Sequence, residues 1–433
     1  MNVTILALGS RGDVQPYATL GKGLRCAGHR VRFVTFESFA PLVAEHGLHL
    51  LPIRGDAQAL VAGAGADMWA IVRSFRTLAE SYAQDLYTLL PALRDTDVLL
   101  NQLPLALYGY DLAQKLGVLM LVVAVMPLTR TRAFPVMGFP RLPIPAYNRL
   151  TYNIAEQMGW VAYRPAINRW RRALGLPGAA LLGYFRQLGT ARYPTLNGFS
   201  ARVVPRPADW GEHVHVTGYW FPEDEHWQPP GDLLAFIRAG PPPVFVGFGS
   251  MPVRNPAHTT GVILEALRQT GQRGILHAGW AGLGELALPD YAFRISYAPY
   301  GWLFPQMAMV VHHGGSGTTA SSLRAGVPSL AVPFLFDQFY WGERIAALGV
   351  GPQAIPYRRL SVERLAQAVA MATTDPQMRE RAAELGRQIC AEKGIDATIA
   401  IIERYASGRT RQNPQSHCFP SITATKGALG YRG

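Results

Sequence analysis

Residues 312–319, His-His-Gly-Gly-Ser-Gly-Thr-Thr, have the composition of an anion-binding turn. They follow an apolar stretch, 307–311, that predicts a buried strand, and they precede 320–325, which predicts a helix ending at Gly326. A strand that turns through glycines into a helix presents free backbone N–H groups and the positive end of the helix dipole, and this arrangement binds phosphate. The alternative is a glycine-rich turn that caps the helix and binds nothing. The expected phosphate ligands are His312, Gly314, Gly315, Ser316, Gly317 and Thr318.

A carboxylate closes the first strand-to-helix turn of the chain. Residues 9–13 are Gly-Ser-Arg-Gly-Asp, and they precede a helical pattern over 14–27. Doubly wound α/β folds place ligands at this position, so Asp13 is a candidate general base. The alternative is an N-cap for the following helix. We expect Arg11 to favour the ionised form of Asp13. The candidate ligands for a phosphate in this turn are Ser10, Arg11 and Gly12.

Two further loops follow predicted strands in the second half of the chain. Ser250 ends the loop Gly-Phe-Gly-Ser at 247–250, which is expected to face the same cleft as Asp13. Asp337 and Gln338 follow the predicted strand 329–332. A carboxylate beside an amide suits a polyol, because together they accept and donate hydrogen bonds to sugar hydroxyls. The alternative for this pair is an ordinary loop and helix cap.

Other polar clusters favour structural roles. Asp95 and Asp97 lie at the start of a predicted strand, away from its carboxyl end, and are expected to form a cap or turn. His213 and His215 alternate on a strand-like run, which favours packing over metal binding. The three cysteines are far apart with no CxxC spacing, so neither a disulfide framework nor a zinc site is expected. We predict no metal site.

Alternating strand and helix patterns predict an α/β fold that contains two doubly wound parallel sheets facing each other across a cleft. Strands are expected at 3–8, 30–35, 48–53, 97–102, 119–125, 244–248, 274–278, 293–296, 307–311 and 329–332. The segment 127–206 is less regular and rich in Pro, Tyr, Trp and Arg, which suits a binding wall. The expected division is an acceptor-binding domain at 1–222, a linker at 223–243, a nucleotide-sugar-binding domain at 244–385, a helix returning to the first domain at 386–407, and a disordered tail at 408–433.

The composition of the 433 residues is globular, with 49% hydrophobic and 16% charged residues, and it excludes disorder as a class. The apolar run at 118–127 has about half of the roughly 20 residues that a membrane span needs. The formal net charge of +12 predicts a solvated basic surface or attraction to an anionic membrane. No nucleic-acid motif accompanies the charge, so no nucleic-acid partner is expected. We expect a cytoplasmic protein, with peripheral membrane contact as the alternative.

Several separate motifs resemble those of the inverting GT-B glycosyltransferases that use UDP-sugars. The carriers of this resemblance are the turn at 9–16, the run at 312–319 and the pair at 337–338. Segments at 126–135, 218–221, 302–306 and 322–328 are similar to the sterol 3-beta-glucosyltransferases within that superfamily. The resemblance covers about residues 1–405. It implies two Rossmann-like domains, with the nucleotide bound by the second.

The resemblance also implies roles for single residues. Asp13 would deprotonate the acceptor hydroxyl, His312 and the N–H groups of 314–318 would bind the diphosphate, and Asp337 and Gln338 would bind the sugar. The donor nucleotide would lie near Ser250, Tyr297 and Ala298. Plant-type relatives have a histidine base where this chain has Asp13. Their ribose carboxylate falls at Ala320 here, and their base-stacking tryptophan matches Tyr297 only with a shift of a few residues.

We therefore expect transfer of a hexose, glucose, from a UDP-sugar to a hydroxyl of a large apolar acceptor such as a sterol or related lipid, without a metal or other cofactor. The candidate acceptor-binding residues are Phe134, Met137, Tyr147 and Tyr193. One alternative is transfer from a dTDP- or UDP-sugar to a polyketide or macrolide. Another is a GT-B nucleotide-sugar epimerase. A nucleotide-binding module without activity is disfavoured because Asp13, His312 and Asp337 are all present. A nicotinamide oxidoreductase is disfavoured because the first turn is not GxGxxG.

Overall fold

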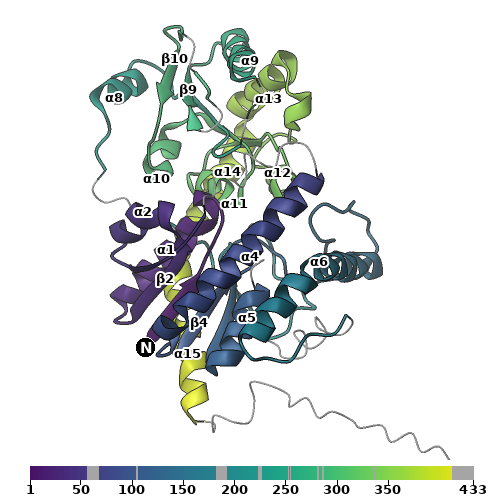
Figure 1. The fold of residues 1–433 in the computed structure, drawn as a ribbon. Coiled ribbons are helices and arrows are strands. Elements are labelled where there is room, and N and C mark those ends of the chain that lie inside the picture. Colours follow the sequence, from purple (N-terminus) through teal and green to yellow (C-terminus); the bar gives the residue numbers. More distant parts are fainter. Residues whose placement is uncertain are drawn as a thin grey trace, which may run out of the picture.

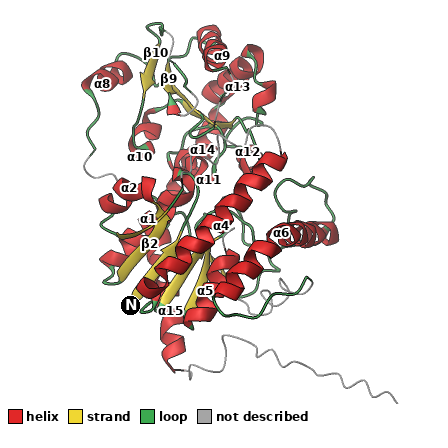
Figure 2. Cartoon of the chain, in the orientation of Figure 1, coloured by secondary structure: helices red, strands yellow, loops and turns green. Residues whose placement is uncertain are grey.

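The computed structural model of the 433-residue chain describes residues 1–55, 68–103, 106–181, 193–222, 227–251, 253, 255–279, 282–284, 287–335 and 337–411. They form two parallel sheets that are stacked end to end in the molecule (Figures 1 and 2). The expected linker residues 223–226 and most of the expected tail, 412–433, lie outside the described residues.

The first sheet has seven strands in the order β3-β2-β1-β4-β5-β6-β7, all paired in parallel. The strands are β1 (Asn2–Leu6), β2 (Arg30–Phe36), β3 (His49–Ile53), β4 (Val98–Gln102), β5 (Leu119–Ala124), β6 (Thr195–Asn197) and β7 (Val214–Val216). The reversal of order beside β1 puts the turn after β1 at the carboxyl edge, where such folds bind ligands. The strands predicted from apolar runs agree with β1 to β5 to within two residues, whereas no apolar run predicted β6 or β7.

Helices cover both faces of the first sheet, as parallel sheets require. One face packs against α4 (Met68–Leu93), α5 (Ala106–Leu116) and α6 (Pro145–Ala173). The other packs against α1 (Arg11–Cys26), α2 (Ala40–Glu45) and α15 (Gly394–Arg411). The segment expected to be irregular, 127–206, thus contains a 29-residue helix, α6.

The second sheet has five parallel strands in the order β10-β9-β8-β11-β12. They are β8 (Val244–Gly247), β9 (Gly274–His277), β10 (Ala292–Ile295), β11 (Met309–His312) and β12 (Ser329–Ala331). The helices of this half are α8 (Gly231–Arg238), α9 (Pro256–Gln269), α10 (Tyr300–Leu303), α11 (Ser316–Arg324), α12 (Asp337–Ala347), α13 (Val362–Thr374) and α14 (Pro376–Cys390). α8 lies within the expected linker and packs on the second sheet, and the expected boundary at 385 falls inside α14.

The chain returns to the first domain at its end. α15 lies against the first domain in Figure 1, where its Ile399 and Ile402 join the core beside β1 and α1. The Trp220 indole donates to the Thr398 hydroxyl (2.9 Å). At the crossing, a Cβ on Gly394 would lie 2.4 Å from the Tyr219 carbonyl oxygen, so glycine permits this close approach of two backbones.

Candidate active site

The first turn is built as a reciprocal helix cap. α1 begins at Arg11, with Ser10 as its N-cap, so Asp13 is the third helical residue and not a loop residue or the N-cap itself. Asp13 Oδ2 accepts hydrogen bonds from the Ser10 backbone N–H and hydroxyl, both at 2.8 Å. This capping box satisfies donors at the helix start and fixes the carboxylate. Glycine is required at position 9 because its φ of +133° is one that other residues rarely adopt, and because an added Cβ would lie 2.6 Å from Asp13 Oδ2.

Gln102 fixes the same turn from the end of β4. Its side-chain oxygen accepts from the Leu8 N–H (2.7 Å), and its Nε2 donates to the Asp13 carbonyl oxygen (3.1 Å). Sequence analysis did not identify Gln102, because the glutamine lies 89 residues from Asp13 and only the β1–β4 pairing brings them together.

Arg11 does not take the role expected of it. Its Nε donates to the Gln15 side chain (3.2 Å), and its guanidinium lies 5.3 Å from the centre of the Tyr297 ring in the second domain. The pKa of Asp13 is raised, chiefly by burial, and the two Ser10 hydrogen bonds oppose that rise. Arg11 therefore bridges the domains and does not favour an ionised Asp13.

The turn that the sequence predicts to bind phosphate lies at the start of α11. This helix begins at Ser316, four residues earlier than expected, so the Ser-Gly-Thr residues form its first turn. The first N–H groups of a helix lack intrahelical partners. The Ser316 hydroxyl crosses to the first domain and donates to the Val125 carbonyl oxygen (2.7 Å). The residues of this turn that line the cleft are Gly315, Ser316, Gly317 and Thr318.

Two histidines precede this turn and differ in position. His312 is fully buried as the last residue of β11, outside the cleft lining, and its Nδ1 accepts from the Gly314 N–H (3.0 Å). His313 lines the cleft, and its Nε2 would lie 2.3 Å from a Cβ on Gly315. Burial lowers the pKa of His312 to about 3 and that of His313 to about 4, so both rings are neutral at pH 7. His312, the histidine expected to meet the diphosphate, therefore lies behind the cleft wall, and His313 is the one that lines the cleft. Gly314 likewise lies behind the lining.

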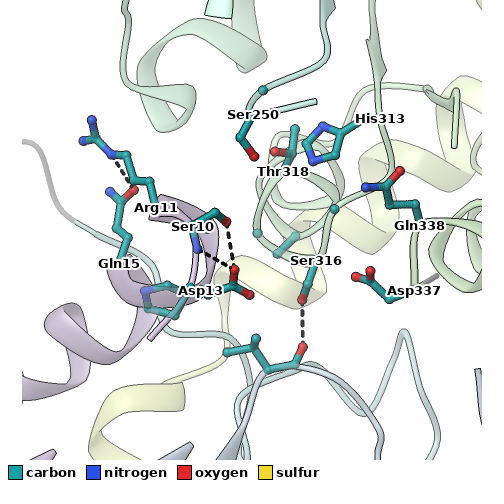
Figure 3. A pocket seen from close by; sticks show the side chains of 18 of the residues that line it. Ser10, Arg11, Asp13, Gln15, Ser250, His313, Ser316, Thr318, Asp337 and Gln338 are labelled. Atoms are coloured by element: carbon teal, nitrogen blue, oxygen red, sulfur yellow. Dashed lines mark hydrogen bonds between the residues drawn. The ribbon is translucent and has the colours of Figure 1, made fainter. Parts of the chain in front are cut away.

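Asp337 and Gln338 begin α12 on the far side of the same cleft, and both line it. Figure 3 shows the carboxylates of Asp13 and Asp337 on opposite sides of one opening, with Ser316 between them. Burial and then the negative charge of Asp13 raise the pKa of Asp337 to about 7. The Gln338 oxygen already accepts from the Phe334 N–H (2.8 Å), and its Nε2 donates to the Met251 sulfur (3.1 Å), so one N–H of the amide remains to bind a sugar hydroxyl.

The cleft has a volume of about 2660 Å³ and is lined from both domains. Ser250, Tyr297 and Ala298 line its second-domain side, as expected. On the first-domain side, Met137 lines it but the other expected acceptor residues do not. Phe134 packs on Tyr340 of α12 (5.9 Å between ring centres), Tyr193 packs on Tyr110 (5.5 Å), and Tyr147 is half-buried outside the lining.

An apolar and aromatic part of the cleft, which we call the tyrosine chamber, replaces them. It is formed by α4, α5, α6 and the residue after β4, and its lining residues are Tyr82, Leu103, Leu107, Tyr108, Tyr163 and Ile167. Sequence analysis missed these residues because periodicity marks them only as core positions of helices. The chamber opens into the same cavity as Asp13, so an apolar molecule can lie in it with a polar end beside the carboxylate.

The remaining polar candidates are structural. Asp97 accepts from the Asn2 N–H (2.7 Å), and Asp95 pairs with Arg32 at 2.5 Å. His215 Nε2 lies 3.0 Å from the Tyr405 hydroxyl oxygen. Within the part of the chain that the structure describes, no group of three His, Cys, Asp or Glu side chains could hold a metal ion. None of the described helices is both long and apolar enough to cross a membrane.

Comparison with known proteins extends this picture. Residues 3–135 match the glycosyltransferase family 28 N-terminal domain, and residues 275–399 match the erythromycin biosynthesis protein CIII-like C-terminal domain. The sterol 3-beta-glucosyltransferase UGT80B1 of Arabidopsis thaliana is 37% identical over 423 residues, which cover 94% of this chain and 68% of that protein. The chain belongs to the sterol 3-beta-glucosyltransferase family. The Aspergillus oryzae sterol 3-beta-glucosyltransferase is also 37% identical, but the chain spans only 31% of its length.

Solved structures of glycosyltransferases share the fold of the present chain. The glycosyltransferase of kitacinnamycin matches with a TM-score of 0.72 at 22% identity, covering 93% of this chain and 98% of that one. The calicheamicin glycosyltransferase CalG4 matches with a TM-score of 0.68 at 18% identity, covering 94% and 98%. The two-domain GT-B architecture predicted from the sequence is thereby confirmed. The family that the sequence relatives show makes the chain a glycosyltransferase.

Proposed function

We propose that this glycosyltransferase moves glucose from UDP-glucose to the hydroxyl of a sterol or related lipid, with inversion at the anomeric carbon. The observation that carries the proposal is that Asp13, the tyrosine chamber and the α11 turn line one cleft. The 37% identity to the plant sterol 3-beta-glucosyltransferase supports both the sugar and the acceptor class.

In this proposal the carboxylate of Asp13 serves as the general base. The acceptor hydroxyl lies at the mouth of the tyrosine chamber and gives its proton to Asp13 as its oxygen attacks the anomeric carbon. The attack comes from the face opposite the nucleotide, so the C–O bond to the diphosphate breaks as the new one forms and the centre inverts. A raised pKa suits a base that must accept a proton near neutral pH.

The second domain stabilises the departing diphosphate. Negative charge grows on it as the C–O bond breaks, and the N–H groups at the start of α11 with the helix dipole stabilise that charge. His313 is proposed as a neutral donor to a phosphate oxygen. Asp337 and the Gln338 NH₂ group are proposed to bind the sugar hydroxyls, and the nucleotide lies along Ser250, Tyr297 and Ala298. The proposed chemistry needs no metal or cofactor.

A lipid acceptor implies contact with the membrane that holds it. We propose that the enzyme is cytoplasmic and binds the surface of an anionic membrane as a peripheral protein. The exposed unpaired cysteines Cys26 and Cys390 suit a reducing compartment. A nucleic-acid partner is not proposed.

The test is an acceptor and donor panel followed by mass spectrometry. Cholesterol, ergosterol, a plant sterol and a macrolide are each incubated with UDP-glucose or dTDP-glucose, with and without EDTA. We expect a hexose adduct of a sterol with UDP-glucose, at a rate that EDTA leaves unchanged. Transfer to the macrolide alone would replace the sterol assignment. A new nucleotide sugar formed without any acceptor would indicate the epimerase reaction.

A further inference from the structure

α6 has an exposed apolar side that the fold does not cover. Leu150, Ile154, Met158 and Val161 are 51%, 40%, 67% and 58% exposed. Their spacing of four, four and three residues puts them in one row along the helix. Figure 1 shows α6 at the outer side of the first domain. A continuous apolar row on a protein surface marks a binding site for a partner or a membrane.

The row continues toward the start of the helix. Leu142 and Ile144, just before α6, are 43% and 50% exposed. These six side chains are half of the twelve large apolar side chains that are exposed in the described structure. We call the six the α6 stripe. Apolar exposure in this molecule is therefore concentrated on one helix and the loop that leads into it.

The charged side chains of α6 are mostly cationic, and Arg141, beside Leu142, is paired with Glu343. Glu156 is the one acidic residue of α6, and Arg130 is paired with it. Arg149 and Arg172 are exposed at opposite ends of the helix. Other arginines of this region are engaged elsewhere, since Arg171 pairs with the buried Asp111. An apolar row with cations at its ends matches a bilayer that carries anionic headgroups.

The opposite side of α6 faces the tyrosine chamber, where Tyr163 and Ile167 contribute to the lining. One helix thus separates the exposed stripe from the proposed acceptor site. We propose that the α6 stripe docks on an anionic lipid bilayer and places the mouth of the tyrosine chamber next to the membrane lipid. The docking surface stands on exposure and charge, and the delivery of acceptor through it rests on the proposed function.

Flotation with lipid vesicles that contain no acceptor tests the docking surface by itself. The full chain is mixed with vesicles of phosphatidylcholine and phosphatidylglycerol at 7:3, or of phosphatidylcholine alone. The test variant is the double substitution Met158→Glu and Val161→Glu. Both side chains are exposed and lie outside the cleft lining, so the fold and the site are unaffected. Met371→Glu on α13, where the side chain is 44% exposed, is the matched control.

We expect the double substitution to reduce partitioning onto the 7:3 vesicles by about tenfold or more, because two apolar side chains leave the apolar layer and two carboxylates replace them. Met371→Glu should bind like the unchanged chain. Arg149→Gln with Arg172→Gln should weaken binding to 7:3 vesicles and leave binding to phosphatidylcholine unchanged. Equal flotation of the stripe variant and the control would overturn the proposal.

Two further measurements separate the alternatives. Sedimentation shows whether the stripe holds a second copy of the chain, and a dimer that the double substitution dissociates would replace the membrane assignment. Transfer to a sterol delivered by cyclodextrin should be unchanged in the stripe variant, whereas transfer to a sterol in 7:3 vesicles should fall about tenfold. If no sterol is glycosylated in either form, the proposed acceptor fails while the flotation result still decides the docking surface.

Discussion

Replacing Asp13 with asparagine separates its chemistry from its structural role. The Asp13 Oδ2 atom accepts two hydrogen bonds from Ser10, each of 2.8 Å, and an amide oxygen can accept the same bonds. The brace from Gln102 reaches the Asp13 carbonyl oxygen, which the substitution leaves in place. The variant should therefore keep the α1 cap and lose only the ability to take a proton.

The expected loss in kcat is about 10²–10⁴, the contribution of a positioned general base, or about 2.7–5.4 kcal/mol of transition-state stabilisation. The free energy of unfolding should not fall, since the cap remains and a neutral amide replaces a buried carboxyl whose pKa is raised by burial. UDP affinity should stay within about threefold, because the proposed diphosphate ligands lie in the α11 turn of the other domain. The same substitution removes the charge that helps to raise the pKa of Asp337.

The assay combines initial rates at saturating acceptor, UDP titration calorimetry and thermal melting. A pH profile adds a readout that a purely structural defect would not move. With a pKa of about 7, Asp337 is neutral below that pH, so sugar binding through an ionised Asp337 should strengthen as the pH rises through 7. In Asp13→Asn this rise should move to lower pH. Turnover within a few fold of the unchanged enzyme, or a loss of UDP affinity equal to the loss in rate, would refute the role of Asp13.

Three further substitutions test the second domain. Asp337→Asn should stabilise the ligand-free protein by about 1–3 kcal/mol at pH 8. The pKa of Asp337 is raised in the folded state, so its ionisation opposes folding increasingly as the pH rises from the ordinary pKa of 3.8 toward 7. Denaturant unfolding at pH 5 and pH 8 checks this, and an equal effect at both pH values would contradict it. His313→Ala should weaken UDP binding about tenfold with little effect on the melting temperature. His312→Ala should instead lower the free energy of unfolding by about 2–3 kcal/mol, because it leaves a cavity under the turn. If His312 met the phosphate, calorimetry would show the loss of UDP affinity in His312→Ala and not in His313→Ala. Gly314→Ala should lower the free energy of unfolding by about 1–3 kcal/mol and also lower donor affinity, since φ is +88° and the new Cβ would lie 2.8 Å from the Gln338 carbonyl oxygen. A variant with a normal melting temperature and a normal KM for the donor would be inconsistent with that strain.

Apolar runs bounded by glycine predicted the positions of β1 to β5 and of the second sheet well, because parallel strands are buried on both faces and consist mainly of apolar residues. The starts of α1 and α11 were placed too late. In both, the first turn contains residues of low helix propensity that are typical of loops, such as glycine, serine and threonine. The helix nevertheless begins among them, with Ser10 as the N-cap of α1 and Gly315 as the N-cap of α11. Local propensity alone does not fix such a boundary.

The position of His312 shows what sequence spacing leaves open. β11 continues through His312, which pairs in register with Gly247 and Ala331 and so stays inside the sheet. Only the strand partners determine that the cleft begins at His313. α6 was missed for another reason. Its apolar residues lie on a side that faces the core and on a side that faces outward, so no single amphipathic period stands out. The acceptor residues were misplaced because the tyrosine chamber is assembled from three helices far apart in the chain.

The return of α15 to the first domain has a consequence for biosynthesis. Domains of most multidomain chains can fold in turn as they leave the ribosome. Here Ile399 and Ile402 complete the apolar layer over β1 and α1, so that layer stays uncovered until both residues have been translated, after the second domain. The first domain to be made is thus the last to be finished, and a fragment that stops before residue 394 would expose an unshielded face to aggregation.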